Sequence, residues 1–221
     1  MIVPGGFGSR GTEGKILALQ FCRENKKPML GICFGMQLAV IEFCRNILGK
    51  TKMTSEELSH GDDPANWAVI HMPEISLDEL GGTMRLGSRL SKFINKDCTT
   101  YKLYGGKRHF FERHRHRYEI NPKIVPSCEK KGLMFVAIGA ERQGSMNIFV
   151  KHKERMEVCE LKDHPFYIAS QFHPELSSKF GKPNPLFTGF VYAANGTLDA
   201  YLEKKKMVGT PEKKPVPTKQ A

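Results

Sequence analysis

Residues 28–37 read Pro28-Met29-Leu30-Gly31-Ile32-Cys33-Phe34-Gly35-Met36-Gln37. The apolar beginning of this segment predicts a short buried strand, and the residues from 35 to about 48 predict a helix. The pattern Gly-x-Cys-x-Gly between them is the cysteine counterpart of the Gly-x-Ser-x-Gly nucleophile elbow, in which a sharp turn presents the central side chain. Glycine on both sides removes the Cβ atoms that would collide in such a bend.

Cys33 would then lie at the N-terminal end of the following helix. The helix dipole and the free backbone amides at such an end favour the thiolate, which is the nucleophilic form of a cysteine. The alternative interpretation is a buried, inert cysteine between two closely packed glycines. The pattern alone leaves both interpretations open.

A glycine-rich segment, Pro4-Gly5-Gly6-Phe7-Gly8, follows residues that match the end of a buried strand. The backbone amides of such a loop can hold an anion or an oxyanion; the other interpretation is a flexible turn. The loop lacks the Lys-Ser/Thr ending of a P-loop, so nucleotide phosphate is not its first ligand.

Residues 12–25 carry apolar side chains at helical spacing. The order strand, loop, helix, strand, elbow, helix predicts an α/β fold with a parallel sheet and helices on its faces. Active sites of such folds lie at the carboxyl ends of the strands. The glycine loop and Cys33 both follow strands, so we expect them to face each other.

Further strands are predicted at residues 67–72, 131–139, 156–161 and 165–172, the second and third of these as an antiparallel pair, and a closing helix at residues 185–202. The last strand ends in His173-Pro174-Glu175. A cysteine nucleophile needs a base, and the base needs an orienting group. We therefore predict Cys33 as nucleophile, His173 as general acid and base and Glu175 as its orienting carboxylate. His114 and His116 are rivals to His173 by residue type.

An oxyanion hole completes this prediction. The backbone N–H of Phe34, directly after the nucleophile, is one expected donor, and that of Gly6 in the glycine loop is the other. This is acyl-transfer chemistry, so the substrate should carry an amide or an ester.

Residues 112–119 read Glu-Arg-His-Arg-His-Arg-Tyr-Glu. In a strand this alternation puts the arginines on one face and the histidines on the other. The arginines could contact nucleic acid, grip the carboxylate of a small acidic substrate, or form a charged edge strand. The segment lacks the interleaved aromatic residues of single-strand binders, and we expect no nucleic-acid partner.

The composition fits one globular domain: 221 residues, 40% hydrophobic, 26% charged and a formal net charge of +11. Six lysines and one glutamate lie from Lys204 onward, so residues 204–221 carry +5 of this charge and are predicted to be a disordered basic tail. No apolar run approaches the length of a membrane span. The six cysteines form no CxxC pair, which predicts no metal site and favours reduced thiols in a cytoplasmic protein.

These motifs resemble the class I glutamine amidotransferases, and within them the amidotransferase domain of the CTP synthases. The elbow and His173-Pro174-Glu175 indicate the wider family. Two further segments restrict the resemblance to the CTP synthases. They are Gly81-Gly82-Thr83-Met84-Arg85-Leu86-Gly87 and the Arg-His alternation at residues 113–117. The resemblance covers residues 2 to 203. It implies a flavodoxin-like class I glutamine amidotransferase fold over residues 1–203, with a mostly parallel sheet flanked by helices, that lacks its first strands.

The resemblance implies that Cys33, His173 and Glu175 hydrolyse L-glutamine to glutamate and ammonia, without a cofactor. In the family the ammonia reaches a synthetase domain that aminates UTP to CTP with ATP and magnesium, and the enzyme is a homo-oligomer, a tetramer. This chain lacks that domain, so full-length CTP synthase subunits are the implied partners. The glutamine-binding positions implied are Gly6, Phe34, Gly35, Met36, Gln37, Glu57 and Arg117.

Several positions depart from the family pattern. Phe34 replaces the usual leucine, and around Glu57 the match is looser, so that Glu56 competes with it. The segment at residues 140–154 is longer than usual. Two other functions remain: an inactive partner that binds full-length subunits, and a stand-alone cysteine hydrolase. Cys33 argues against the first, because a purely structural module needs no nucleophile.

Overall fold

In a computed structural model of the chain, the structure describes residues 1–59, 61, 63–72, 84–140 and 155–208. A seven-stranded sheet forms its centre, with the strand order β1-β2-β10-β9-β8-β5-β6. A small second sheet has the order β3-β4-β7. The strands of the large sheet are β1 (Ile2–Val3), β2 (Met29–Ile32), β10 (Tyr167–Ser170), β9 (Met156–Leu161), β8 (Leu133–Gly139), β5 (Arg85–Phe93) and β6 (His109–His116). Those of the small sheet are β3 (Thr54–Ser55), β4 (Trp67–His71) and β7 (Tyr118–Ile120).

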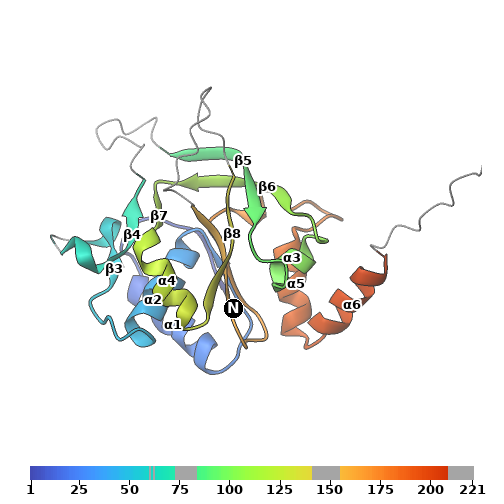
Figure 1. Cartoon of the computed structure of the whole chain (residues 1–221), viewed down its shortest axis with the longest axis horizontal. Helices are drawn as coiled ribbons and strands as arrows, with labels where there is room; N and C mark the ends of the chain where they lie inside the picture. Colours follow the sequence, from blue (N-terminus) through green and yellow to red (C-terminus); the bar gives the residue numbers. More distant parts are fainter. Residues whose placement is uncertain (60, 62, 73–83, 141–154, 209–221) are drawn as a thin grey trace, which may run out of the picture.

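Helices cover both faces of the large sheet (Figure 1). Helices α1 (Thr12–Glu24), α2 (Phe34–Asn46) and α4 (Val125–Lys130) share one apolar core with their face of the sheet. Helices α3 (Thr99–Leu103), α5 (Pro185–Ala194) and α6 (Leu198–Val208) close a second core on the other face. Short 3-10 turns lie at Glu56–Leu58 (η1), Pro64–Asn66 (η2), Pro122–Ile124 (η3) and Pro174–Leu176 (η4).

The α/β fold and most predicted elements are confirmed, but the sheet is mixed. Strands β1, β2 and β10 pair in parallel, whereas the pairs β10–β9, β9–β8, β8–β5 and β5–β6 are antiparallel. The expectation of a mostly parallel sheet is wrong beyond β10. The first strands are joined through helix α1, which allows a parallel crossover, whereas only residues 162–166 join β9 to β10 and permit a hairpin alone.

The C-terminal part differs in two further ways from the prediction. The closing helix is two helices, because Asn195 ends α5 and Gly196 has a left-handed φ of 69°, a conformation that stops a helix. Helix α6 continues to Val208, so the predicted tail boundary at 204 falls inside it. Residues 209–221, most of residues 140–154 and Gly81 to Thr83 lie outside the described residues.

The elbow depends on very close packing of helix α2. A Cβ atom built on Gly35 would lie 2.3 Å from the carbonyl oxygen of Val3, and one built on Gly31 would lie 2.9 Å from Cβ of Ala169. Residues 34–44 of α2 are all buried. The helix is therefore a central core element that packs directly on β1. Because it begins at the residue after Cys33, this packing also fixes the position of Cys33.

We predict that Gly35→Ala destabilises the fold by about 1–3 kcal/mol, because the new methyl group has no room beside Val3. Gly14 on helix α1 is the matched control: nothing lies within 4 Å of its Cβ position, and Gly14→Ala should stabilise by about 0.5–1 kcal/mol. Urea unfolding measures both free energies. Equal effects of the two substitutions would contradict the packing account.

Candidate active site

Cys33 occupies the turn between β2 and α2 in a strained backbone conformation, with φ 52° and ψ −102°. Its backbone N–H donates to the carbonyl oxygen of Ser170 at 2.6 Å, which fixes the turn against the end of β10. Phe34 is the first residue of α2, so its N–H has no acceptor within the helix. The predicted elbow is confirmed as a strand-turn-helix with the thiol at its tip.

His173 follows β10, and its backbone N–H donates to the carbonyl oxygen of Arg113 on β6 at 2.8 Å. Its Nδ1 lies 2.6 Å from Oε1 of Glu175, as predicted for a base and its orienting carboxylate. Its Nε2 is buried and makes no hydrogen bond within the part of the chain that the structure describes. One ring nitrogen is thus held by Glu175 and the other is left for a proton transfer.

Gly5 shows how close Cys33 and His173 lie. A Cβ atom at Gly5 would be 2.7 Å from Cε1 of His173 and 3.4 Å from Cβ of Cys33. The glycine loop therefore passes directly beside the thiol and the imidazole, as expected from their positions at neighbouring strand ends. Sequence reasoning named Gly6 but missed Gly5, because only the fold shows which glycine touches both side chains.

The electrostatics of His173 fit this arrangement. Burial lowers the pKa of His173, but its interactions with the thiol of Cys33 and the carboxylate of Glu175 outweigh burial and raise the pKa to about 10. Burial likewise raises the pKa of Glu175, whereas the hydrogen bond from His173 lowers it, and the net shift is downward. The imidazole therefore carries its proton at neutral pH next to the sulfur.

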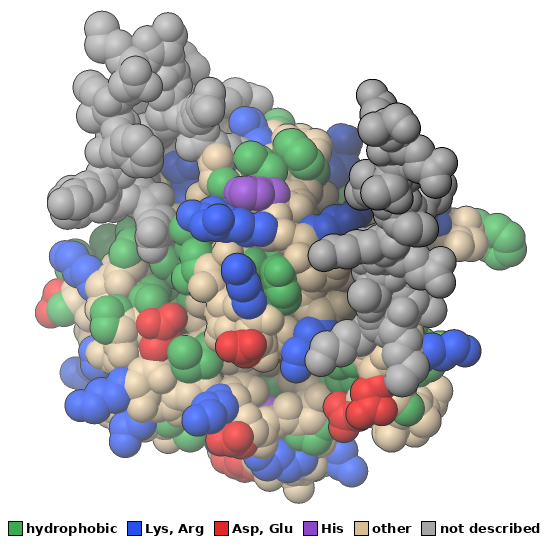
Figure 2. Space-filling model, turned by 45° about the vertical axis from the view of Figure 1, so that its right-hand side comes forward, with side chains coloured by type: hydrophobic (Ala, Val, Ile, Leu, Met, Phe, Trp, Pro, Cys, Tyr) green, Lys and Arg blue, Asp and Glu red, His purple; other side chains and the backbone are tan. Residues whose placement is uncertain are grey.

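The rival histidines serve the core instead. Nε2 of His114 lies 2.7 Å from Glu157, which also accepts from Arg85 at 2.7 Å, and all three side chains are buried. Burial, together with the charge of Arg85, lowers the pKa of His116 to about 3. The predicted alternation is confirmed, since the histidines face inward while Arg113 and Arg115 are exposed. Figure 2 shows Lys and Arg side chains scattered over the face in view rather than gathered in one basic patch.

Glu57 and Glu56 point to different partners. Oε1 of Glu57 accepts the backbone N–H of Gly8 in the glycine loop at 2.9 Å. Oε2 of Glu56 accepts the backbone N–H of His71 on β4 at 2.6 Å. Glu57 therefore faces the loop beside Cys33, and Glu56 ties η1 to the small sheet.

Arg117 lies where the chain leaves β6 of the large sheet and enters β7 of the small one. Its Nε is buried and has no hydrogen-bond partner among the described residues. Burial raises the pKa of the neighbouring Tyr118, Glu57 and Glu56 raise it further, and Arg117 opposes them. Arg117, with its Nε unpartnered among the described residues, and the carboxylate of Glu57 thus both lie near Tyr118.

The other predicted positions lie in the same region with different surroundings. The ring of Phe34 is buried beside Gly6, with Nζ of Lys15 5.2 Å from its centroid. Met36 is buried in the core, and its N–H donates to the carbonyl oxygen of Cys33. Nε2 of Gln37 donates to the carbonyl oxygen of Tyr118 and to Oε1 of Gln171, both at 3.2 Å. Sequence reasoning missed Gln171, because no pattern separates it from the strand that precedes it.

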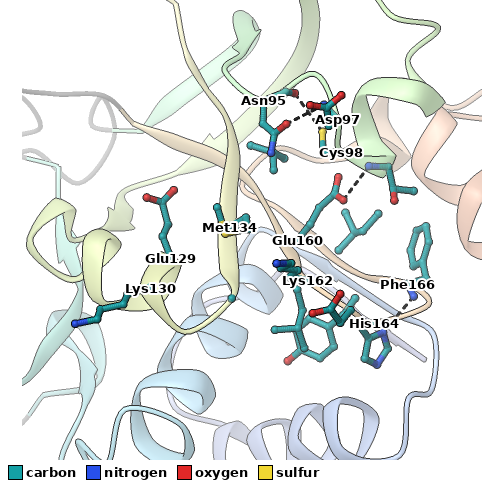
Figure 3. Close-up of a pocket in the computed structure, with 17 residues that line it drawn as sticks. Asn95, Asp97, Cys98, Glu129, Lys130, Met134, Glu160, Lys162, His164 and Phe166 are labelled. Carbon is teal, nitrogen blue, oxygen red and sulfur yellow. Dashed lines mark hydrogen bonds between the residues drawn. The ribbon is translucent and has the colours of Figure 1, made fainter.

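A separate hollow of about 550 Å³ lies at the other end of β8 and β9 (Figure 3). Its Glu160 accepts the backbone N–H groups of Thr99 and Thr100 at the start of α3. Burial raises the pKa of its Cys98 thiol to about 12, so this cysteine is a poor nucleophile. The described lining of this hollow thus offers no counterpart of the pair formed by Cys33 and His173.

The described residues contain no helix long and apolar enough to cross a membrane. They also contain no cluster of His, Cys, Asp and Glu side chains that could hold a metal ion.

Comparison with known proteins identifies the class. The family model for glutamine amidotransferase class-I matches residues 1–193, and the chain belongs to this family. It is 49% identical over 203 residues to CTP synthase 2 of Xenopus laevis and 47% identical over 206 residues to human CTP synthase 1, and each match covers 92% of the chain. The chain spans 33% and 32% of the length of these two relatives.

A solved structure agrees with these sequence matches. The glutaminase domain of the Trypanosoma brucei CTP synthase, with bound acivicin, has a TM-score of 0.78 and 34% sequence identity to the chain. The match covers 88% of this chain and 70% of that one. The class I glutamine amidotransferase fold, inferred above from motifs, is confirmed.

The environment of His173 gives a prediction about pH. The pKa of His173 in the folded chain lies above the ordinary value of about 6.5, so the stabilising interactions of the charged ring are complete below that value and are lost as the pH rises towards about 10. In Glu175→Gln the ring loses the carboxylate that favours its charged form. We expect its titration midpoint, followed by NMR of the imidazole C–H groups, to move down from about 10. An unchanged midpoint in the folded variant would show that Glu175 does not set it.

Proposed function

We propose that this chain is the glutamine-hydrolysing part of a CTP synthase. The observation that carries the proposal is the meeting of Cys33, His173 and the glycine loop around Gly5, with the second ring nitrogen of His173 held by Glu175. Family membership supplies the substrate class, and the identity to the CTP synthases supplies the reaction that uses the product.

In the proposed reaction, Sγ of Cys33 attacks the side-chain amide carbon of L-glutamine. The carbonyl oxygen becomes an oxyanion, which accepts from the N–H groups of Phe34 and Gly6. His173 gives its proton to the departing nitrogen, so that ammonia leaves and a thioester remains. His173 then takes a proton from water, the resulting hydroxide attacks the thioester, and glutamate and the Cys33 thiol are released.

Two charged side chains supply the proposed specificity for glutamine. Nε of Arg117, buried and without a hydrogen-bond partner in the described part of the chain, suits the α-carboxylate, because guanidinium donors bind carboxylates strongly. The carboxylate of Glu57, next to the glycine loop, suits the α-ammonium group. Gly35, Met36 and Gln37 lie in the first turn of helix α2, directly after Phe34, and are proposed to line the glutamine site.

The ammonia is proposed to pass to a synthetase domain or to full-length CTP synthase subunits, which would use ATP and magnesium to aminate UTP. The described residues do not fit a magnesium site, and the glycine loop lacks the lysine of a P-loop. We also propose, as expected from the sequence, that the chain works in a homo-oligomer and in the cytoplasm.

Steady-state glutamine hydrolysis, measured as glutamate release, tests the proposal with a matched pair of variants. Glu57→Gln should raise KM about 10- to 100-fold, because a charged hydrogen bond to the α-ammonium group is lost. Glu56→Gln should leave KM near that of the wild type, because Glu56 holds His71 instead.

Cys33→Ala is the control for the chemistry and should release no glutamate above background. Hydrolysis that persists in folded Cys33→Ala would contradict the proposed nucleophile. Folded wild-type chain that hydrolyses no glutamine, with or without full-length CTP synthase subunits, would favour the inactive-partner alternative.

A further inference from the structure

Gln171 is a fully buried amide in contact with the thiol of Cys33. It follows β10 directly, is 1% exposed, and its backbone N–H donates to the carbonyl oxygen of Glu157 on β9 at 2.9 Å. Its side-chain Nε2 lies 3.5 Å from Sγ of Cys33 and donates to it. The neighbouring strand thus fixes the backbone of a residue whose side chain ends on the sulfur.

The orientation of this amide follows from its neighbours. The carbonyl oxygen of Tyr118 can only accept, so Gln37 must turn its NH₂ group toward it. The same NH₂ group also donates to the side chain of Gln171 at 3.2 Å. The acceptor there must be the amide oxygen of Gln171. The nitrogen of Gln171 is then left on the side of Cys33. The relay from Tyr118 through Gln37 excludes the flipped amide, which would set two donors against each other.

We propose that Gln171 is a further catalytic residue, whose N–H group stabilises the thiolate of Cys33 and fixes the sulfur, with Gln37 as its positioning residue. An N–H group donates more strongly to an anion than to a neutral thiol, so this contact favours the reactive form. The assignment rests on the proposed role of Cys33 as nucleophile. In this assignment Gln37 orients the amide of Gln171 toward the sulfur, in addition to any contact that Gln37 makes with the substrate.

The other groups around Cys33 define what Gln171 adds. His173, oriented by Glu175, is the ionisable side chain that faces the thiol from the end of β10. Strand β6 meets Sγ through the carbonyl oxygen of Arg115 at 3.9 Å, while the arginine side chain is exposed. This carbonyl can bind only the protonated thiol. The first turn of α2 carries no acidic side chain. Gln171 is thus a neutral donor that favours the thiolate, whereas the carbonyl oxygen of Arg115 favours the protonated thiol.

The test is the pH dependence of alkylation of Cys33 by iodoacetamide, read from the mass of the Cys33 peptide of the 221-residue chain. Gln171→Met removes the donor, and we expect alkylation at neutral pH to slow about tenfold, with the midpoint moving to higher pH. Gln171→Glu keeps the size of the side chain and the acceptor for Gln37 but turns a negative oxygen toward the sulfur, so its midpoint should move further. Gln20→Glu, on the outer side of α1, adds the same charge elsewhere and should behave as wild type.

If Gln171→Glu is folded and its alkylation midpoint is unchanged, the assignment is overturned. This variant still tests the assignment if Gln171→Met fails to fold. Glutamine hydrolysis by the same proteins separates the two proposals. Shifted midpoints in a chain that hydrolyses no glutamine support the Gln171 assignment and contradict the proposed function. Normal hydrolysis with unchanged midpoints contradicts the Gln171 assignment alone.

Discussion

The strained backbone of Cys33 is the constraint on which the rest of the site depends. A φ of 52° with a ψ of −102° is unusual for any residue other than glycine and costs about 1–3 kcal/mol. The short hydrogen bond from Cys33 to Ser170 and the contact of Gly35 with Val3 hold it in place. Because α2 is buried along almost its whole length, relaxing the turn would pull a core helix off the sheet. The apolar core thereby stabilises a geometry that the turn alone would not keep.

A buried ionic cluster supports the same site from the antiparallel half of the sheet. Glu157 on β9 binds Arg85 on β5 and His114 on β6 through its side chain, and its carbonyl oxygen accepts from Gln171. Burial raises the pKa of Glu157, but its interactions with His114 and Arg85 outweigh burial and lower the pKa to about 2, so it remains a carboxylate. Removal of one partner from such a cluster would leave an uncompensated buried charge. The cluster therefore fixes three strands relative to the segment that ends in His173.

The proximity of Cys33, His173 and Glu175 was predicted from the sequence, whereas the direction of most strands was not. Cys33 could be named because it lies between the two glycines of an elbow pattern, and His173 and Glu175 because a base and a carboxylate follow a predicted buried strand. The mixed sheet could not be predicted from the first strands, since strand direction depends on connections further along the chain. The histidines at 114 and 116 matched a catalytic base by residue type. Only the structure shows that both are buried, with His114 hydrogen-bonded to Glu157 and His116 to the carbonyl group of Tyr118. Gln171 and Gly5 carry no pattern, because their importance comes entirely from what the fold places beside them.

Resemblance to a family could name Glu57 but not separate it from Glu56, because both lie in the same short turn, η1. The hydrogen bond to Gly8 separates them, because it directs one carboxylate to the glycine loop. No sequence pattern could show that Nε of Arg117, which lies where the chain passes from β6 to β7, is buried without a hydrogen-bond partner among the described residues. The carboxylate of Glu57 already accepts from Gly8, whereas Nε of Arg117 keeps an unused donor within the described part of the chain.

The most direct measurement is the intact mass of the chain after exposure to an electrophilic analogue of glutamine, with Cys33→Ala beside it. The account predicts one adduct, mapped to Cys33, that excess L-glutamine prevents and that Cys33→Ala does not form. An adduct on another cysteine, or an adduct that glutamine does not prevent, would contradict a glutamine-specific site built around the Cys33 elbow.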